Sequence, residues 1–283
     1  MRLGRSRRST NVEDYRNSPG GGRPGMKFGL GTIAVLVIGY FLGINPLTML
    51  GVMNGMQGPA PTAEPAPGGA PSDTNSDLVR AVLGETEDTW GAIFQARGEQ
   101  YPPPTLALFR GGIQSACGSA SSASGPFYCP GDQKVYIDLA FYDELAGQFE
   151  APGDFAQAYV LAHEVGHHVQ NVLGTLGKVQ AAQQQQDEEG RNQLQVRVEL
   201  QADCYAGIWA HHADKSRGIL EPGDIEEGLR AASAVGDDTI QRRMQGHVVP
   251  ESFTHGSAEQ RMHWFTRGYE SGELPACDTF SAR

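Results

Sequence analysis

The longest apolar run of the chain lies near its beginning, over residues 28–44. Residues 28–53 carry no charged side chain, and about 20 apolar residues are enough to cross a bilayer. We therefore predict one transmembrane helix over residues 28–50. A cleaved signal peptide is the alternative, but the segment ahead of the run is unusually long, and no small-residue cleavage site follows it directly.

A change of composition after this run marks a linker. Residues 51–75 are rich in Pro, Ala and Gly, and such a segment cannot bury enough apolar surface to fold by itself. We expect it to separate the transmembrane helix from a folded domain over residues 76–283. Ser76 is the predicted N-cap of the first helix of that domain.

Within the predicted domain, the hydrophobic period alternates between helical and extended. Apolar side chains recur at helical spacing in several segments, whereas residues 105–109 and 134–138 are typical of strands. The first of these two strands is a candidate edge strand for pairing with an extended peptide. The pattern predicts an α+β fold that is mostly helical with a small β-sheet. The expected helices cover residues 76–98, 140–147, 155–173, 192–214, 224–234 and 257–269, with a solvated helix or loose connection over 178–190.

Charge is distributed unevenly along the chain. The first 27 residues carry seven Arg and Lys side chains against Glu13 and Asp14, whereas the remainder carries 15 basic and 31 acidic side chains. Basic residues ahead of an apolar run predict that residues 1–27 are cytoplasmic and that the body is exported to the periplasm or the cell exterior. The acidic body argues against a nucleic-acid partner, which needs a basic face.

The chain has four cysteines, at positions 117, 129, 204 and 277. No C-x-x-C pair is present, which argues against a zinc ribbon or a thioredoxin-like motif. An even number of cysteines in an exported domain favours two disulfides, for which three connectivities exist. The simplest pairs Cys117 with Cys129 across a short Gly/Ser-rich loop, and Cys204 with Cys277. Free thiols are the expectation if the body is cytosolic.

The sequence His163-Glu164-Val165-Gly166-His167 has the spacing of a zinc site. On a helix, the two histidines lie on one face and can bind the same Zn²⁺. Glu164 can take a proton from a zinc-bound water and pass a proton to the leaving amine. Apolar neighbours favour this interpretation over surface histidines, because burying these polar groups without a partner is costly. Gly166 suggests that another backbone or a ligand approaches closely.

A third ligand is expected from a later helix. Glu199 and Asp203 lie four residues apart among apolar neighbours, and a catalytic zinc usually has three protein ligands. We predict that Glu199 completes a His₂Glu set. Asp203 is expected to accept the free ring N–H of a ligand histidine and so to fix its orientation. The alternative is that both carboxylates face water.

A further histidine is a candidate for stabilising the transition state. His255 lies just ahead of the predicted helix over residues 257–269 and could donate a hydrogen bond to an oxyanion, or it could simply belong to the helix start. Asp237 and Asp238 could orient His255, but we interpret them as solvated turn residues. His168 lies on another face and is expected to support the site or to lie on the surface.

Taken together, these motifs resemble the bacterial "putative neutral zinc metallopeptidase" family, which is similar to the gluzincins. The resemblance covers essentially all of residues 76–271 and the N-terminal apolar segment. It implies a zincin-like fold, with His163, His167 and Glu199 as zinc ligands and Glu164 as the base, and those four positions show no departure from the pattern. The matching stretches are residues 113–118, 125–130, 135–139, 162–170, 199–204, 206–209, 254–257, 260–261 and 264–265.

We therefore predict a membrane-anchored zinc-dependent endopeptidase with its metallopeptidase domain over residues 76–283. Its base is Glu164, its cofactor is Zn²⁺ and its substrate is an extended polypeptide. Two alternatives keep the same zinc site. One is an envelope scaffold or binding module with little turnover, and the other is a zinc amidohydrolase acting on cell-wall peptides.

Overall fold

The structure is a computed structural model that describes residues 1–16 and 73–281. The predicted transmembrane helix over residues 28–50 lies outside the described residues, as does almost all of the predicted linker. Within the described part of the chain, none of the helices combines the length and the apolar character needed to cross a membrane.

The chain divides into two compact units, which are described separately. Of the described residues, the helical unit contains 1–11, 73–104 and 142–281, and the sheet unit contains 12–16 and 105–141. The combination of many helices with a small sheet confirms the predicted α+β class.

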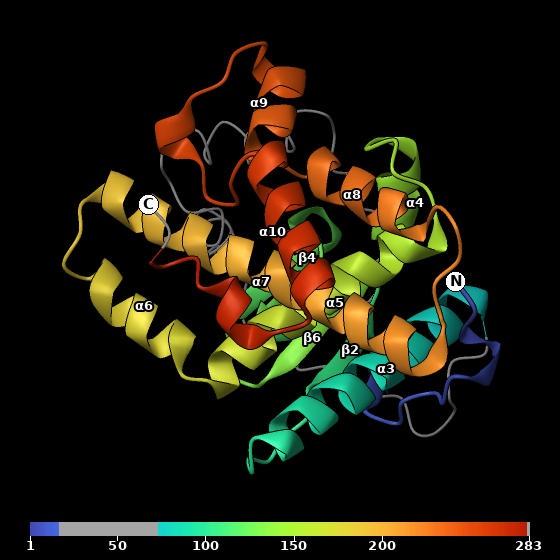
Figure 1. The fold of residues 1–283 in the computed structure, drawn as a ribbon. Coiled ribbons are helices and arrows are strands. Elements are labelled where there is room, and N and C mark those ends of the chain that lie inside the picture. Colours follow the sequence, from blue (N-terminus) through green and yellow to red (C-terminus); the bar gives the residue numbers. More distant parts are fainter. Residues whose placement is uncertain (17–72, 282–283) are drawn as a thin grey trace. The chain divides into compact units, whose positions relative to one another are not determined.

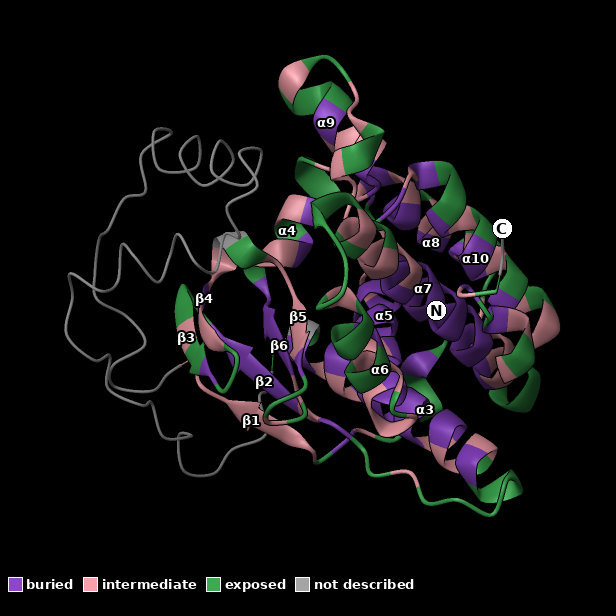
Figure 2. Ribbon diagram, turned by 90° about the vertical axis from the view of Figure 1, so that its left-hand side faces the viewer, coloured by how far each residue is buried: buried purple, intermediate pink, exposed green. Residues whose placement is uncertain are grey.

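The sheet unit contains a four-stranded sheet and a separate hairpin (Figure 2). In the sheet, β1 and β2 are parallel, β2 and β6 are parallel, and β5 is antiparallel to β6. Its buried side chains include Ala107, Phe109 and Tyr136. The strands are β1 (Val12–Asp14), β2 (Thr105–Phe109), β5 (Phe127–Cys129) and β6 (Lys134–Asp138), and the hairpin consists of β3 (Gly112–Ser115) and β4 (Gly118–Ser121).

The prediction that residues 105–109 form an edge strand is wrong. β2 lies between β1 and β6, and its backbone groups on both sides are used by these neighbours. The pairing was missed because β1 is a short and charged segment, Val12-Glu13-Asp14, whose extended form is stabilised by a strand far along the chain. A strand paired on both sides cannot add a peptide by its edge.

The helical unit is built around α7. Helix α5 packs on α7, and α10 packs on it as well, while α3 and α8 contact α5 (Figure 1). Trp90 of α3 and Trp209 of α7 are fully buried in this core. The helices are α3 (Thr74–Ala96), α5 (Asp154–Val172), α6 (Thr175–Gln183), α7 (Glu188–Arg217), α8 (Asp224–Ala234), α9 (Asp237–Gln245) and α10 (Ala258–Ser271), together with α4 (Ala140–Gly147), which begins in the sheet unit. Short 3₁₀ turns occupy η1 (Leu3–Arg5), η2 (Ser122–Ser124), η3 (Pro250–Ser252) and η4 (Leu274–Cys277).

Glycines allow the three central helices to approach one another closely. A Cβ on Gly166 of α5 would lie 2.9 Å from the carbonyl oxygen of Ala202 on α7. Likewise, a Cβ on Gly207 of α7 or on Gly268 of α10 would collide with the backbone of the other helix. The close backbone approach predicted at Gly166 is therefore confirmed, and it brings α5 and α7 within reach of a shared site.

Both predicted disulfides are confirmed. Cys117 and Cys129 are joined within the sheet unit, with a Cα–Cα distance of 5.8 Å. Cys204 of α7 and Cys277 of η4 are joined within the helical unit, with a Cα–Cα distance of 5.6 Å. The second disulfide fixes the C-terminal segment against α7.

The start of α3 differs from the prediction. The N-cap is Asp73, and its side chain accepts a hydrogen bond from the backbone N–H of Ser76 at 3.0 Å. Ser76 therefore lies inside the first turn. The aspartate was missed because it falls in the Pro/Ala/Gly-rich stretch that was assigned to the linker.

Residues 1–11 are part of the helical unit and pack on α3. Arg7 forms an ion pair with Glu87 at 2.6 Å, and the buried Ser9 donates a hydrogen bond to the same carboxylate at 2.6 Å. A Cβ on Gly84 would lie only 2.6 Å from the carbonyl oxygen of Arg7. The basic residues of this segment thus meet acidic groups of α3, and the segment is not separate from the folded body.

Candidate metal centre

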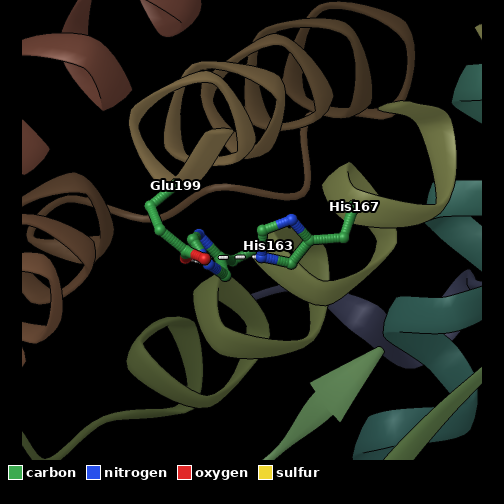
Figure 3. Close-up of side chains that lie close together, drawn as sticks. All are labelled: His163, His167 and Glu199. Carbon is green, nitrogen blue, oxygen red and sulfur yellow. Dashed lines mark hydrogen bonds and ion pairs between the residues drawn. The ribbon is translucent and has the colours of Figure 1, made fainter. Parts of the chain in front are cut away.

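Side chains from α5 and α7 converge on one point in the helical unit. Each of His163, His167 and Glu199 offers a ligand atom, and these atoms all lie within 4.8 Å of one another (Figure 3). Glu199 Oε2 lies 3.1 Å from His163 Nε2 and 3.4 Å from His167 Nε2. The structure therefore brings together the three residues that the sequence predicts as ligands.

The spacing of these atoms fits a zinc ion. Ligand atoms about 2.0–2.1 Å from a tetrahedral zinc lie about 3.3 Å from one another. The two observed nitrogen–oxygen distances, 3.1 and 3.4 Å, fall on either side of that value. Two imidazoles and one carboxylate are also a donor set found in catalytic zinc sites, so the chemistry of the cluster and the distances from Glu199 to both histidines fit Zn²⁺.

The helices explain how these three side chains meet. His163 and His167 are one turn apart on α5, and their rings are 4.8 Å apart and nearly perpendicular, at 87°. Glu199 comes from the facing side of α7. Its Oε1 accepts a hydrogen bond from Gln195, one turn earlier, at 2.8 Å. This bond holds Glu199 in place and leaves its Oε2 for a metal.

A buried carboxylate orients His163. Asp203 Oδ1 lies 2.8 Å from His163 Nδ1, so Nδ1 carries the hydrogen and Nε2 is left for a metal. The hydrogen bond predicted for Asp203 is therefore present. The same carboxylate accepts two hydrogen bonds from Arg261, at 2.8 and 2.9 Å, and one from the hydroxyl of Tyr159.

The charged side chains of this cluster favour the ionised forms of one another. Burial lowers the pKa of His163, but the carboxylates of Asp203 and Glu199 outweigh it and raise that pKa to about 9. Burial raises the pKa of Asp203, but Arg261 and His163 outweigh it and lower that pKa to about 2. The pKa of Glu199 likewise falls well below its ordinary value, because His167 and His163 outweigh its burial. Metal binding at this cluster would therefore displace protons from the imidazoles.

Glu164 lies next to the cluster on the same helix. Its side chain is buried, with 8% exposure. Its charge acts on both His167 and Tyr142, and together with burial it raises the pKa of Tyr142. A carboxylate in this position is close to a metal held by the two histidines without being one of the three converging ligands.

His255 is held by a buried carboxylate ahead of α10. Its Nδ1 lies 3.2 Å from Asp237 Oδ1, and Asp237 Oδ2 accepts hydrogen bonds from the backbone N–H groups of Thr254, His255 and Gly256. Partial burial of the ring lowers the pKa of His255, but Asp237 and Glu199 outweigh this effect and raise the pKa above its ordinary value. The side chain of His255 is 47% exposed, so it is open to solvent near the metal cluster.

Two interpretations of polar residues were wrong. Asp237 is not a solvated turn residue, because its side chain is only 6% exposed and it organises the loop that carries His255. The surface position, one of the two alternatives expected for His168, is also wrong. His168 is fully buried, and its Nε2 lies 2.6 Å from the carbonyl oxygen of Pro102.

Comparison with known proteins places the chain in a family. Residues 1–280 match the sequence profile of the family described as "Putative neutral zinc metallopeptidase". The chain belongs to this family. No solved structure matches it, so the zincin-like character of its fold stays a prediction.

Relatives of this family member occur in Escherichia coli and in Mycobacterium tuberculosis. The chain is 46% identical over 286 residues to "Uncharacterized protein YpfJ" of Escherichia coli (strain K12), covering 99% of both chains. It is also 46% identical over 215 residues to "Uncharacterized protein Rv2575" of Mycobacterium tuberculosis, covering 72% of both chains. The names of these two relatives assign no substrate.

We did not predict from the sequence that Arg261 and Tyr159 belong to the site. A signal for Arg261 was present, because it shares one face of the predicted helix with Trp264, Phe265 and Gly268, all of which are buried. An arginine on an apolar face needs a buried partner. Tyr159 lies one turn before His163 on the same face of α5, so its position beside the site could also have been predicted from the four-residue spacing.

Proposed function

We propose that the protein is a zinc-dependent peptidase that hydrolyses peptide bonds. His163, His167 and Glu199 hold the zinc ion, and Glu164 is the general base. The observation that carries this proposal is the convergence of the three ligand atoms within 4.8 Å of one another, beside a buried glutamate on the helix that carries both histidines.

Zinc bound at this cluster supplies Lewis acidity, which polarises a carbonyl and favours the ionisation of water. Glu164 accepts the proton of the attacking water and then passes a proton to the nitrogen of the departing amine. Its burial limits competition from solvent for this proton.

His255 is proposed to stabilise the oxyanion that forms when water adds to the carbonyl. Asp237 holds Nδ1 of the ring at 3.2 Å, which fixes the direction in which the opposite nitrogen, Nε2, points. A hydrogen-bond donor that is already oriented stabilises developing charge without reorganising during the reaction.

We also propose that the body is exported and attached to the membrane through residues 28–50. The two disulfides support an exported body, because such bonds persist in oxidising compartments. A single crossing by residues 28–50 puts residues 1–27 in the cytoplasm, as their charge predicts. The packing of residues 1–11 on α3 instead requires both segments on one side of the membrane, so the location of the N-terminus decides between the two arrangements.

Protease treatment of bacterial spheroplasts tests this location. We expect protease added outside to remove a tag at the C-terminus and to leave a tag at the N-terminus protected. Removal of both tags would contradict a single crossing and favour the packing of residues 1–11 on the exported body. Protection of both tags would contradict export.

Replacement of the base tests the proposed chemistry. Glu164→Gln keeps the size of the side chain but cannot accept a proton, so it should still bind one zinc per chain. Peptide hydrolysis should fall by about 10²- to 10⁴-fold, the range for general-base catalysis. Glu85→Gln is the matched control, because Glu85 is also buried in the helical unit and pairs with Arg217 at 2.6 Å.

The assay uses an unbiased peptide library together with cell-wall peptides. Equal hydrolysis by Glu164→Gln and the control would contradict the proposed base. A wild-type protein that holds one zinc and cleaves no member of either set would contradict the proposed peptidase activity and favour a binding role. Cleavage confined to the cell-wall peptides would favour the amidohydrolase alternative.

A further inference from the structure

A line of neutral amides connects His167 to the C-terminal segment. His167 Nδ1 lies 2.9 Å from Gln170 Oε1, and Gln170 Nε2 lies 3.1 Å from Gln201 Oε1. Gln201 Nε2 then lies 2.9 Å from the carbonyl oxygen of Cys277. Gln170 is fully buried and Gln201 is 7% exposed, so both amides depend on protein partners for their hydrogen bonds.

The direction of every hydrogen bond in this series follows from the carbonyl oxygen of Cys277, at the end farthest from His167. A backbone carbonyl can only accept, so the amide nitrogen of Gln201 must face Cys277 and its oxygen must face Gln170. Gln170 therefore presents its nitrogen to Gln201, and the same nitrogen donates a second hydrogen bond to the carbonyl oxygen of Val198 at 2.8 Å. Both hydrogens of the Gln170 amide are thus used, and its oxygen is turned towards His167.

This direction determines which nitrogen of His167 carries hydrogen. The Gln170 oxygen can only accept, so Nδ1 of His167 must donate to it. In the neutral ring, the lone pair is then on Nε2, which is the nitrogen that points to Glu199 and to the metal cluster. The ring is oriented without a charged partner, in contrast to His163, whose Nδ1 lies against the carboxylate of Asp203.

We propose that Gln170 is the positioning residue for His167, and that its amide is directed by the carbonyl oxygens of Val198 and, through Gln201, of Cys277. The proposal rests on the proposed zinc site, because it concerns how that site presents its second imidazole. It also gives the Cys204–Cys277 disulfide a role, since this bond fixes the carbonyl at the far end of the line.

Zinc affinity of the whole chain tests this proposal without an activity measurement. Gln170→Met has a similar shape but lacks the acceptor, and loss of a partner to a ligand histidine weakens zinc binding by about 10- to 100-fold. Gln201→Met leaves the bond to Val198 intact, so it should weaken binding by about 2- to 10-fold, as expected for one neutral hydrogen bond. Gln241→Met is the matched control, because Gln241 is also buried but its amide bonds to Val249 and Ser252, away from the metal cluster.

Dissociation constants are measured by competition with a chelator, on protein whose folding is checked by circular dichroism. In parallel, long-range ¹H–¹⁵N spectra of the zinc-loaded wild type should show the His167 ring protonated at Nδ1. The same spectra of Gln170→Met should show a changed or exchanging Nδ1 proton. If Gln170→Met does not fold, the zinc affinity of Gln201→Met and the spectrum of the wild type still test the positioning role of Gln170.

The two proposals fail in different ways. A wild type that binds no zinc, or that binds it equally well after His167→Ala, would overturn the metal site itself. If zinc binding by the wild type requires His167, but Gln170→Met and Gln201→Met bind zinc as tightly as the control, only the positioning role is overturned. Protonation of His167 at Nε2 in the zinc-loaded protein would do the same.

Discussion

The buried pair of Arg261 and Asp203 provides a sharp test of how the site is held together. Their side chains are 4% and 0% exposed, and two hydrogen bonds of 2.8 and 2.9 Å join them. Arg261→Met removes both guanidinium hydrogen bonds to Asp203 and leaves Oδ2 of this buried carboxylate without its charged partner. Breaking such a pair from one side costs about 3–5 kcal/mol in the free energy of unfolding.

An exposed ion pair supplies the comparison. Arg97 and Glu99 are 3.2 Å apart, and both side chains are 45% exposed, so Arg97→Met should cost less than about 1 kcal/mol. Both variants are measured by urea unfolding of the metal-free protein. Arg261→Met should also weaken zinc binding by about 10- to 100-fold, because Asp203 would no longer be held against His163.

A double-mutant cycle separates the pair from its surroundings. Asp203→Asn alone leaves the Arg261 charge buried without its carboxylate, whereas the double variant leaves no uncompensated charge. The double variant should therefore lose less stability than the sum of the single variants, by about 0.5–3 kcal/mol. Additive losses, or a cost for Arg261→Met no larger than that for Arg97→Met, would refute the argument.

Three further predictions follow from the packing and the loops. Gly166→Ala should destabilise the protein by about 1–3 kcal/mol, because the new methyl group would press on Ala202; a thermal melt as stable as that of wild type would contradict the close approach. Replacing the Cys204–Cys277 disulfide, which closes a separation of 73 residues, by two serines should cost about 4 kcal/mol in chemical unfolding, and a loss below about 1 kcal/mol would show that the C-terminal segment is held by other contacts. Burial raises the pKa of Asp237, but hydrogen bonds from His255 and the backbone lower it below its ordinary value. Its stabilisation is therefore complete above about pH 4 and is lost as the pH falls through the lowered folded-state pKa. The protection factors of the amides in the loop before α10, which correct for the intrinsic pH dependence of exchange, should fall only in stronger acid, and a fall near neutral pH would contradict this.

Much of the fold was predictable because its elements are fixed by local pattern. The strands over residues 105–109 and 134–138 and the helices over residues 140–147 and 224–234 have the predicted bounds. In each of them the apolar period and the bordering turn residues agree. Helix α9 was missed because few of its residues are buried, so it shows little apolar period.

Elements stabilised by distant partners were not predictable in this way. The strand β1 depends on pairing with β2, almost a hundred positions further along the chain. The placement of residues 1–11 depends on acidic groups of α3. Their basic character predicts a cytoplasmic segment, and local sequence does not show which carboxylates such residues meet.

In the candidate site too, local contacts were predictable from the sequence and contacts between helices were not. His163, His167 and Glu164 were predictable because the spacing of one motif places them on one helix, and Glu199 with Asp203 repeats that logic on a second helix. The orienting bonds of Arg261 and Gln170 cross between helices, so neither partner follows from spacing alone.

The central claim is that two imidazoles and one carboxylate hold a single zinc ion between α5 and α7. A crystal structure of the zinc-loaded protein, with anomalous data on both sides of the zinc edge, tests it most directly. We predict one strong zinc peak about 2.0–2.2 Å from His163 Nε2, His167 Nε2 and a carboxylate oxygen of Glu199. A zinc peak elsewhere, or a Glu199 side chain turned away from the two histidines, would contradict the account.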